Sequence, residues 1–230
     1  MVFHDDTLEE LTSGSGYIHE KRFDDLPGLD FEKAKLIHEK IKRCEKSLDS
    51  KIPLLEDLFK ELPDAPIMID IKQNDPLIPE LLHELIKKYE REENTCWGSL
   101  RHESINQKLY GLNNKIPLFF SKVGILKIYV FYYLGLLPFV PIKESVLQVP
   151  MDVPGMQWSF LSSMLFYHLN ARGIPALVFK LPGGAVNTKE DWELCRTSGV
   201  NGICTDDVVS LKTYFEEIVK DVKDENKASR

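Results

Sequence analysis

Short apolar runs alternate with segments of helical periodicity along most of this 230-residue chain. The run at 66–72 turns polar at its end, and residues 77–89 then carry leucine and isoleucine at helical spacing. The order repeats toward the C-terminus, where apolar runs at 175–181 and 200–206 flank a helical segment at 191–198. Strand followed by helix, repeated this often, predicts a parallel sheet and favours a closed β/α barrel over an open sheet.

Other segments fit the same series. The apolar run Met1-Val2-Phe3 opens the chain and predicts a strand that delivers His4 and Asp5 at its end. Further strands are predicted at 94–100 and 115–121, and further helices at 52–59, from about 101 to 110, at 160–171 and at 208–223.

Composition and charge narrow the class of protein. With 43% hydrophobic and 28% charged residues, the chain is expected to fold around one sizeable core. The formal net charge of -7 argues against nucleic acid as the main partner. The cysteines at 44, 96, 195 and 204 are widely spaced and follow no signal peptide, which predicts reduced thiols in a reducing compartment. No transmembrane anchor is recognisable in these residues.

Three of the predicted strands end in groups that suit phosphate chemistry. His4-Asp5, Asp70-x-Lys72 and Thr205-Asp206 each follow an apolar run, and the C-terminal ends of strands in a β/α barrel meet at one mouth. Histidine exchanges protons near neutral pH. A carboxylate binds hard divalent cations through oxygen, and lysine offsets phosphate charge. Metal-assisted hydrolysis of a phosphate ester is one interpretation; the other is that Asp70 and Lys72 form a strand-end ion pair and His4 lies in a loop.

The segment 128–140 departs from the series, because its thirteen residues carry no charge; Lys127 precedes it and Lys143 follows it. Such a segment is too short to span a bilayer, which takes about 20 apolar residues. It is predicted either to be a helix or barrel insertion that buries itself, or to be an interfacial element whose tyrosines lie at the depth of lipid headgroups.

Several blocks, in order, resemble the glycerophosphodiester phosphodiesterase domain family. The block Phe-His-Asp-Asp-x-Leu with the following Thr-Ser-Gly, at 3–14, is similar to the His-Asp-x-x-Leu…Thr-Gly block of that family. Similar blocks are Ile-Pro-Leu-Leu-Glu-Asp-Leu at 52–58, Ile-Asp-Ile-Lys at 69–72 and Gly-Ile-Cys-Thr-Asp at 202–206. The insertion at 134–140 most resembles the membrane-associated eukaryotic branch, whose members act as lysophospholipase D enzymes.

The resemblance implies a TIM-type (β/α) barrel of the PLC-like phosphodiesterase kind. It implies hydrolysis of glycerophosphodiesters or lysophospholipids, with release of choline or another alcohol. His4 matches a catalytic histidine, Lys72 matches the lysine thought to contact phosphate, and Asp70 matches one ligand of a Mg²⁺ or Ca²⁺ ion. The branch implies a protein that is membrane-associated or cytoplasmic, near an endoplasmic reticulum-like compartment, with a membrane surface as a partner of 128–140.

The departures from the family pattern are equally specific. The His-Arg-Gly and Glu-x-Asp blocks, which carry the other histidine and two further carboxylates, are expected upstream of Met1, so the barrel is predicted to lack its first two strands. Glu10 replaces an arginine, Phe179 a tryptophan and Pro182 an asparagine. The metal site is therefore expected to be incomplete, and the sequence leaves the catalytic competence of these residues open.

Two functions follow from these expectations. One is a phosphoric diester hydrolase; the other is a catalytically inactive, degenerate barrel that serves as a lipid-binding or protein-interaction scaffold. In either case the predicted domain spans 1–223, with an insertion at 122–157 and a charged tail at 224–230.

Overall fold

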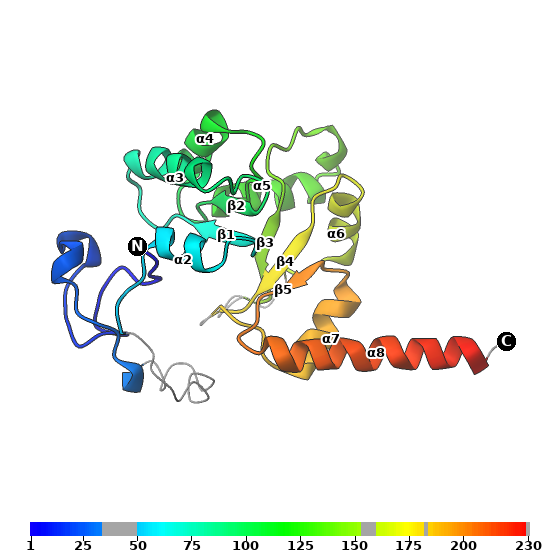
Figure 1. The fold of residues 1–230 in the computed structure, drawn as a ribbon. Coiled ribbons are helices and arrows are strands. Elements are labelled where there is room, and N and C mark those ends of the chain that lie inside the picture. Colours follow the sequence, from blue (N-terminus) through cyan, green and yellow to red (C-terminus); the bar gives the residue numbers. More distant parts are fainter. Residues whose placement is uncertain (34–49, 153–159, 182–183, 229–230) are drawn as a thin grey trace. The chain divides into compact units, whose positions relative to one another are not determined.

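The computed structural model describes residues 1–33, 50–152, 160–181 and 184–228, and for the last helix it describes side chains up to residue 220. Two compact units divide the chain, Met1–Ile116 and Pro117–Arg230. Both units are built from short parallel strands with intervening helices (Figure 1).

Unit 1 contains a two-stranded parallel sheet and three α-helices among its described residues. The strands pair in register from Ile67 opposite Thr95 to Asp70 opposite Gly98. The elements in chain order are η1 (Ile18–Glu20), η2 (Phe23–Asp25), α2 (Leu55–Glu61), β1 (Ile67–Asp70), α3 (Leu77–Lys88), β2 (Thr95–Gly98) and α4 (Glu103–Leu112).

The core of unit 1 lies between the sheet and the helices α3 and α4. Trp97 of β2, Ile86 of α3 and Leu109 of α4 are all completely buried. Arg91, which follows α3, is 1% exposed, and its guanidinium lies 4.8 Å from the ring centroid of Phe59 on α2. This guanidinium donates hydrogen bonds to the carbonyl groups of Leu62, Pro63 and Ala65. It therefore replaces the water that these carbonyls of the loop before β1 would otherwise bind.

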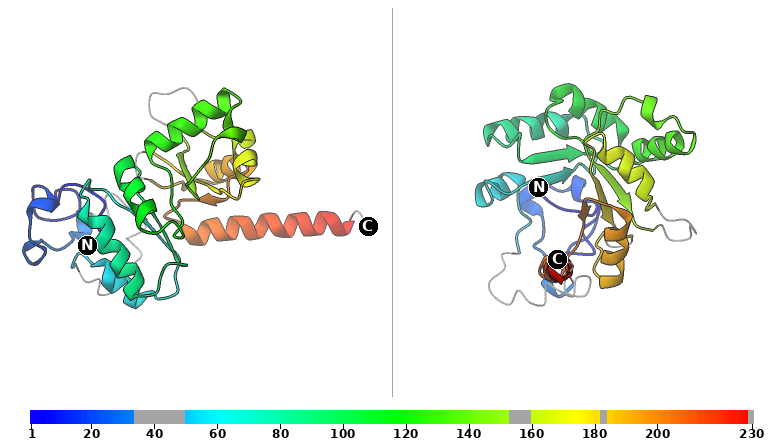
Figure 2. Two further views of the ribbon diagram at one scale, coloured as in Figure 1. Left: turned by 90° about the horizontal axis from the view of Figure 1, so that it is seen from above. Right: turned by 90° about the vertical axis from the view of Figure 1, so that its right-hand side faces the viewer.

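Unit 2 contains a three-stranded parallel sheet in the order β3-β4-β5. Figure 2 shows helices along one side of this sheet and the long last helix extending away from it. The elements are α5 (Lys122–Tyr133), η4 (Leu137–Phe139), β3 (Leu147–Pro150), α6 (Ser163–Asn170), β4 (Ala176–Phe179), α7 (Lys189–Ser198), β5 (Gly202–Ile203) and α8 (Val208–Ala228).

Alternating burial along the strands of unit 2 identifies the face that the helices cover. Leu147 and Val149 of β3, and Ala176 and Val178 of β4, are buried, whereas the residues between them are half-buried. This period of two is that of a strand with one face in a core. The helices contribute the buried side chains Leu165, Phe166 and Leu169 of α6 and Trp192 and Cys195 of α7.

Two glycines, Gly173 and Gly199, lie at helix ends in unit 2. Both glycines have a positive φ, of 73° and 77°, in the left-handed region that side chains with a Cβ avoid. Gly173 follows the end of α6 and Gly199 is the C-cap of α7. Each lets the chain leave its helix and enter the next strand within a few residues.

Three predicted elements differ from the structure. Residues 1–4 form no strand: Val2 donates to the carbonyl of Pro53, and proline has no N–H with which to return a ladder bond. The segment 115–121 forms isolated bridges at Leu118 and Phe119, the latter with Val146, and Pro117 interrupts the run. The third difference is β3, which lies in the range 122–157 predicted as an insertion and pairs with β4. Its four residues include a glutamine and end in a proline, so the sequence offers little strand signal there.

The C-terminal helix is longer than predicted. Alpha-helix continues to Ala228, so most of the predicted tail 224–230 is helical. Its first residues pack on α7 through Tyr214, whose ring centroid lies 5.6 Å from that of Trp192. The charge of this segment is compatible with helix, because lysine and glutamate are both good helix formers.

The thiol of Cys195 provides a test of the core of unit 2. Burial raises its pKa from 9 to about 11, and nearby Asp191 acts in the same direction. The folded state therefore disfavours the thiolate, and this part of the stability, present below pH 9, is lost as the pH rises toward 11. We expect the urea midpoint to fall over this range, and to fall less steeply in Cys195→Ala. Equal slopes in the two proteins would contradict this account.

Candidate active site

Asp70 and Lys72 lie together at the C-terminal end of β1. Two residues apart on an extended chain, their side chains lie on the same side of it. Lys72 Nζ donates to Asp70 Oδ2 at 2.6 Å, and the side chains are 23% and 26% exposed. The structure thus contains the strand-end ion pair that one interpretation predicted. A lysine ammonium has three donors, so this contact alone does not use up its hydrogen-bonding capacity.

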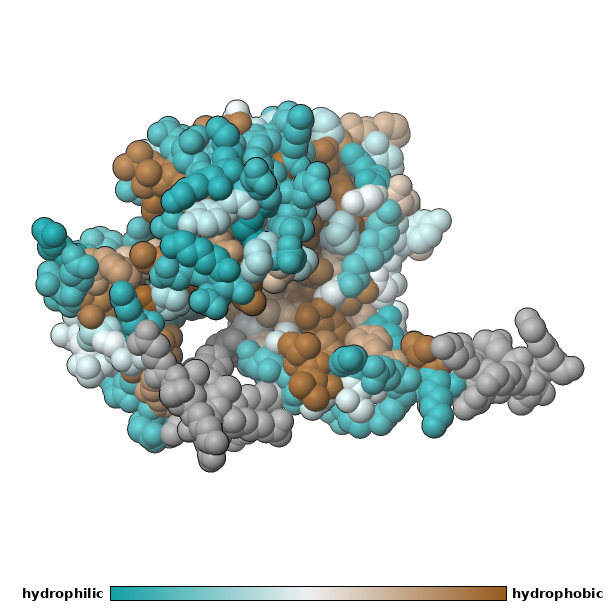
Figure 3. All heavy atoms as spheres, viewed as in Figure 1, coloured by the Kyte–Doolittle hydropathy of each residue, from teal (hydrophilic) through white to brown (hydrophobic). Residues whose placement is uncertain are grey.

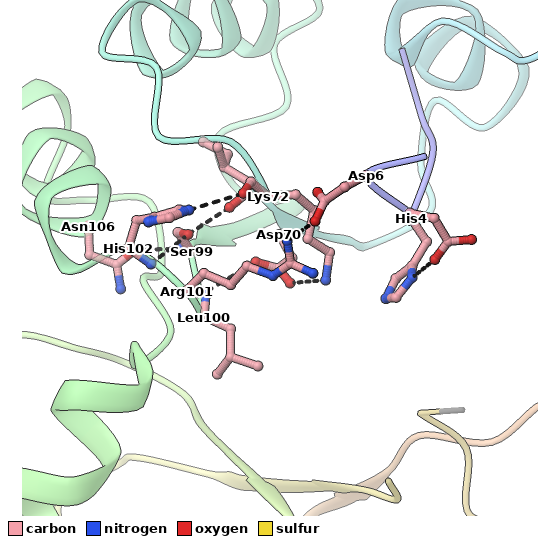
Figure 4. Close-up of polar contacts among 11 residues, drawn as sticks. His4, Asp6, Asp70, Lys72, Ser99, Leu100, Arg101, His102 and Asn106 are labelled. Atoms are coloured by element: carbon pink, nitrogen blue, oxygen red, sulfur yellow. Dashed lines mark hydrogen bonds and ion pairs between the residues drawn. The ribbon is translucent and has the colours of Figure 1, made fainter. Parts of the chain in front are cut away.

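The loop after β2 completes the surroundings of Asp70. The backbone N–H of Leu100 donates to Asp70 Oδ1 at 3.1 Å, and the hydroxyl of Ser99 donates to the carbonyl of Ile71 at 2.6 Å. Asn106, a buried residue of α4, accepts from the N–H of Ser99 at 2.6 Å. These bonds join the ends of the two strands and hold the Asp70 carboxylate from both sides (Figure 4).

His102 is a residue of the site that sequence patterns do not identify. It is half-buried at the start of α4, and its Nε2 lies 3.1 Å from the carbonyl oxygen of Lys72. With the proton on Nε2, the ring donates to this carbonyl and holds the backbone from which the Lys72 side chain projects. No sequence signal marked it, because the two residues are 30 positions apart.

His4 belongs to the N-terminal segment, away from regular secondary structure. Its Nδ1 lies 2.8 Å from Asp5 Oδ1, and its side chain is 73% exposed. Among the described residues, no hydrogen bond or ion pair joins His4 to Asp70 or Lys72. Asp70 and Lys72 lie together at one strand end, whereas His4 is linked to this strand end through its neighbours. That the strand ends at His4-Asp5, Asp70-x-Lys72 and Thr205-Asp206 meet at one mouth stays a prediction.

The link between His4 and the strand ends is an ion pair. Asp6, two residues after His4, accepts from Arg101 Nη1 at 2.7 Å, and Arg101 belongs to the loop after β2 (Figure 4). The segment is further held by the N–H of Ile18, which donates to the Asp6 carbonyl at 3.0 Å. Exposed ion pairs are individually weak, so Arg101 positions this segment without contributing much to stability.

The predicted metal ligand does not fit a hard cation as it stands. Such ions take about six or more oxygen ligands. Both oxygens of Asp70 already accept hydrogen bonds, from Lys72 at 2.6 Å and Leu100 at 3.1 Å. Within the described ranges, no three His, Cys, Asp or Glu side chains form a cluster suited to a metal ion. No catalytic step is therefore assigned to a metal.

The other predicted strand end, Thr205-Asp206, lies in unit 2. Thr205 donates to Asn187 Oδ1 at 2.9 Å, and Asn187 Nδ2 donates to Asp206 Oδ2 at 3.2 Å. These contacts join the segment before α7 to the loop between β5 and α8. Of the two departures in β4 and its continuation, Phe179 is half-buried at the end of the strand, and Pro182 lies outside the described residues.

Comparison with known proteins identifies the family. Residues 1–116, which contain Asp70, Lys72 and the N-terminal segment with His4, match the model of the glycerophosphoryl diester phosphodiesterase family. The chain belongs to this family. Its reaction class is accordingly that of the phosphodiesterase hydrolases, as the sequence predicted.

Curated relatives extend the match beyond the first unit. The human protein named lysophospholipase D GDPD1 is 32% identical over 234 residues, which cover 94% of this chain and 72% of the relative. Human lysophospholipase D GDPD3 is 30% identical over 219 residues, covering 84% of this chain and 66% of the relative.

Solved structures confirm the fold class. A crystal structure assigned to a glycerophosphoryl diester phosphodiesterase of Silicibacter pomeroyi superposes with a TM-score of 0.66 at 14% identity, covering 94% of this chain and 78% of the other. The likeness includes strands and helices of both units, and the parallel β/α elements are those of a TIM-barrel phosphodiesterase. None of the helices in the described part of the chain combines the length and apolar character needed to cross a bilayer.

Proposed function

We propose that the chain hydrolyses the phosphodiester of lysophospholipids or glycerophosphodiesters and releases an alcohol such as choline. The reaction breaks one P–O bond, adds the hydroxyl of water to phosphorus and leaves a proton on the departing alcohol. Family membership and two relatives named as lysophospholipase D enzymes support the substrate class. The observation that carries the proposal is the lysine held at the end of β1.

Lys72 is proposed to bind the phosphoryl oxygens. One of its three N–H donors is used by Asp70, at 2.6 Å, and this contact fixes the ammonium at the strand end. His102 holds the carbonyl of the same residue, at 3.1 Å, so both the backbone and the side chain of Lys72 are positioned before substrate arrives. A preorganised cation stabilises negative charge that develops on phosphoryl oxygens in the transition state.

His4 is proposed to exchange the proton. With the proton on Nδ1, the ring donates to Asp5 Oδ1 at 2.8 Å, which leaves Nε2 as an acceptor for a proton from water. The carboxylate of Asp5 also stabilises the imidazolium that forms. The side chain is 73% exposed, so Nε2 is within reach of a substrate in solution.

The divalent cation expected of the family stays a prediction for this chain, as does the role of Asp70 as its ligand. In the described structure the Asp70 carboxylate instead accepts hydrogen bonds from Lys72 and from the N–H of Leu100. Asp70 is therefore proposed to act first as the residue that positions Lys72.

Replacement of Lys72 tests the proposal. We expect Lys72→Met to lower choline release from lysophosphatidylcholine by about 10–100-fold, because one charge-assisted hydrogen bond is worth about 1.5–3 kcal/mol. Release is measured by a coupled choline oxidase assay, with Mg²⁺ and with Ca²⁺. Lys87→Met, which removes an exposed lysine paired with Glu84 at 3.6 Å, is the matched control and is expected to retain full activity.

The second candidate function is a scaffold that binds lipid without hydrolysing it. The bonds to both oxygens of Asp70 favour it, because they make this carboxylate part of a closed polar network. A chain that binds lysophosphatidylcholine but releases no choline above the protein-free background would establish this alternative. Turnover that Lys72→Met reduces and Lys87→Met does not would exclude it.

A further inference from the structure

We propose that the outer face of α5, with the turn and η4 that follow it, is a docking surface for an anionic lipid bilayer. We call this surface the α5–η4 patch and define it by the exposed apolar residues Val123, Leu126, Val130, Tyr133, Leu134, Leu136 and Phe139. The proposal goes beyond hydrolysis, because it concerns binding to a membrane that contains no substrate.

The helix α5 is apolar on two opposite sides. On the inner side, Ile125, Ile128 and Tyr129 are 7%, 3% and 6% exposed, and Tyr129 packs edge-on against Phe160 at 5.4 Å between ring centroids. This side belongs to the core of unit 2. An ordinary surface helix of a soluble protein would be polar on the side that remains.

The outer side of α5 is not polar. The positions 123, 126, 130, 133 and 134 follow one another at the spacing of a single helix face, and these residues are 47%, 64%, 45%, 64% and 64% exposed. A contiguous apolar stripe on a surface marks an interaction site, unlike single exposed apolar residues.

The patch continues past the end of α5. Gly135 has a φ of 70°, and the chain turns at this residue. Leu136 and Phe139 follow the turn and are 45% and 82% exposed. In the view of Figure 3, hydrophobic surface appears at the upper right, where Figure 1 draws the chain between α5 and β3.

This turn is held in place by the rest of unit 2. Leu137 is 3% exposed and anchors η4 in the core, and Arg172 donates to the carbonyls of Leu137 and Val140 at 3.0 Å and 2.9 Å. Phe139 is thus fixed in an exposed position by buried neighbours, so its exposure is a property of the folded unit.

Charge distinguishes a bilayer from other occupants. Residues 122–143 contain three lysines and no acidic residue, although the chain as a whole carries a net charge of -7. Lys122 and Lys127 lie on the exposed side of α5 next to the stripe, and among the described residues they form no ion pair. An apolar stripe flanked by lysines matches the acyl boundary and anionic headgroups of a membrane surface.

The length of α5 determines how it would lie. Its 12 residues extend about 18 Å at 1.5 Å per residue, less than the ~30 Å hydrocarbon core. The helix would therefore lie in the plane of the interface, with Tyr133 and Phe139 at headgroup depth. The sequence left open whether 128–140 is buried or interfacial. In the structure the inner side of α5 is buried, and the outer side is exposed and available to a membrane surface.

Vesicle flotation tests the proposal. We expect the chain to float with vesicles of phosphatidylcholine and phosphatidylserine, and less with phosphatidylcholine alone. The double variant Leu126→Asp with Phe139→Asp is expected to lower the partition coefficient at least about tenfold, because it places two charges in the apolar layer. Each of Lys122→Gln and Lys127→Gln should lower it about fivefold on the anionic vesicles and little on the neutral ones.

The matched control is Leu81→Asp on α3, which replaces a leucine that is 60% exposed, close to the 64% of Leu126. It should bind vesicles as the parent does. A parent chain that does not float, or a control that loses binding to the same extent, would overturn the proposal. So would a stable dimer that Leu126→Asp with Phe139→Asp dissociates, because a second copy would then cover the patch. Since the vesicles contain no lysophospholipid, these outcomes are independent of the choline release assay.

Discussion

Replacement of His4 by alanine is expected to lower choline release by about 10²–10⁴-fold, the usual contribution of a group that transfers a proton in the transition state. The expectation rests on the Nδ1 contact with Asp5 at 2.8 Å, which orients the ring and leaves Nε2 available to substrate. Initial rates with lysophosphatidylcholine measure the effect.

Two variants separate a role in catalysis from a role in structure. His19→Ala removes another histidine of the N-terminal segment, whose ring is tilted against that of Tyr17 at 5.4 Å between centroids, and should leave the rate unchanged. Asp5→Asn keeps the shape of the carboxylate but removes its charge, and should lower the rate less than His4→Ala. If His4→Ala retains the rate of the parent, the proposed proton transfer by this residue is wrong.

Replacement of Arg91 by methionine is expected to lower the free energy of unfolding by about 3 kcal/mol. Arg91 is 1% exposed and its guanidinium donates to the carbonyls of Leu62, Pro63 and Ala65, so its removal leaves these carbonyls without their donors. The same change removes the stacking of the guanidinium on Phe59, at 4.8 Å. Urea denaturation followed by circular dichroism gives the magnitude.

The control for this stability prediction is Arg22→Met, which replaces an exposed arginine beside η2. It should change the free energy of unfolding by less than about 0.5 kcal/mol. Arg91→Lys should fall between the two, because lysine keeps the charge but cannot reproduce the planar fork that reaches several carbonyls. Equal midpoints for Arg91→Met and the parent would show that the loop carbonyls are satisfied in another way.

The local strand pattern of the sequence was sufficient to predict where Asp70 and Lys72 lie. Asp70 and Lys72 lie two residues apart on one strand, so their shared side and their position at the strand end depend on nothing distant. By contrast, His102, Arg101 and Asn106 contact residues from 7 to 95 positions away, and their residue types are common on surfaces. No pattern in one sequence distinguishes such contacts from solvated side chains.

The sequence by itself determined the alternation of strands and helices, the position of Asp70 and Lys72 at a strand end, and the family, because each depends on residues close together in the chain. The tertiary structure decided what depends on partners. Residues 1–4 form no strand because Pro53, their neighbour, cannot return a ladder bond, and Leu147–Pro150 form one because β4 pairs with them. It also decided which side of 122–133 is buried. This helix is apolar on two opposite sides, so only packing against the rest of unit 2 could distinguish its core side from its exposed side.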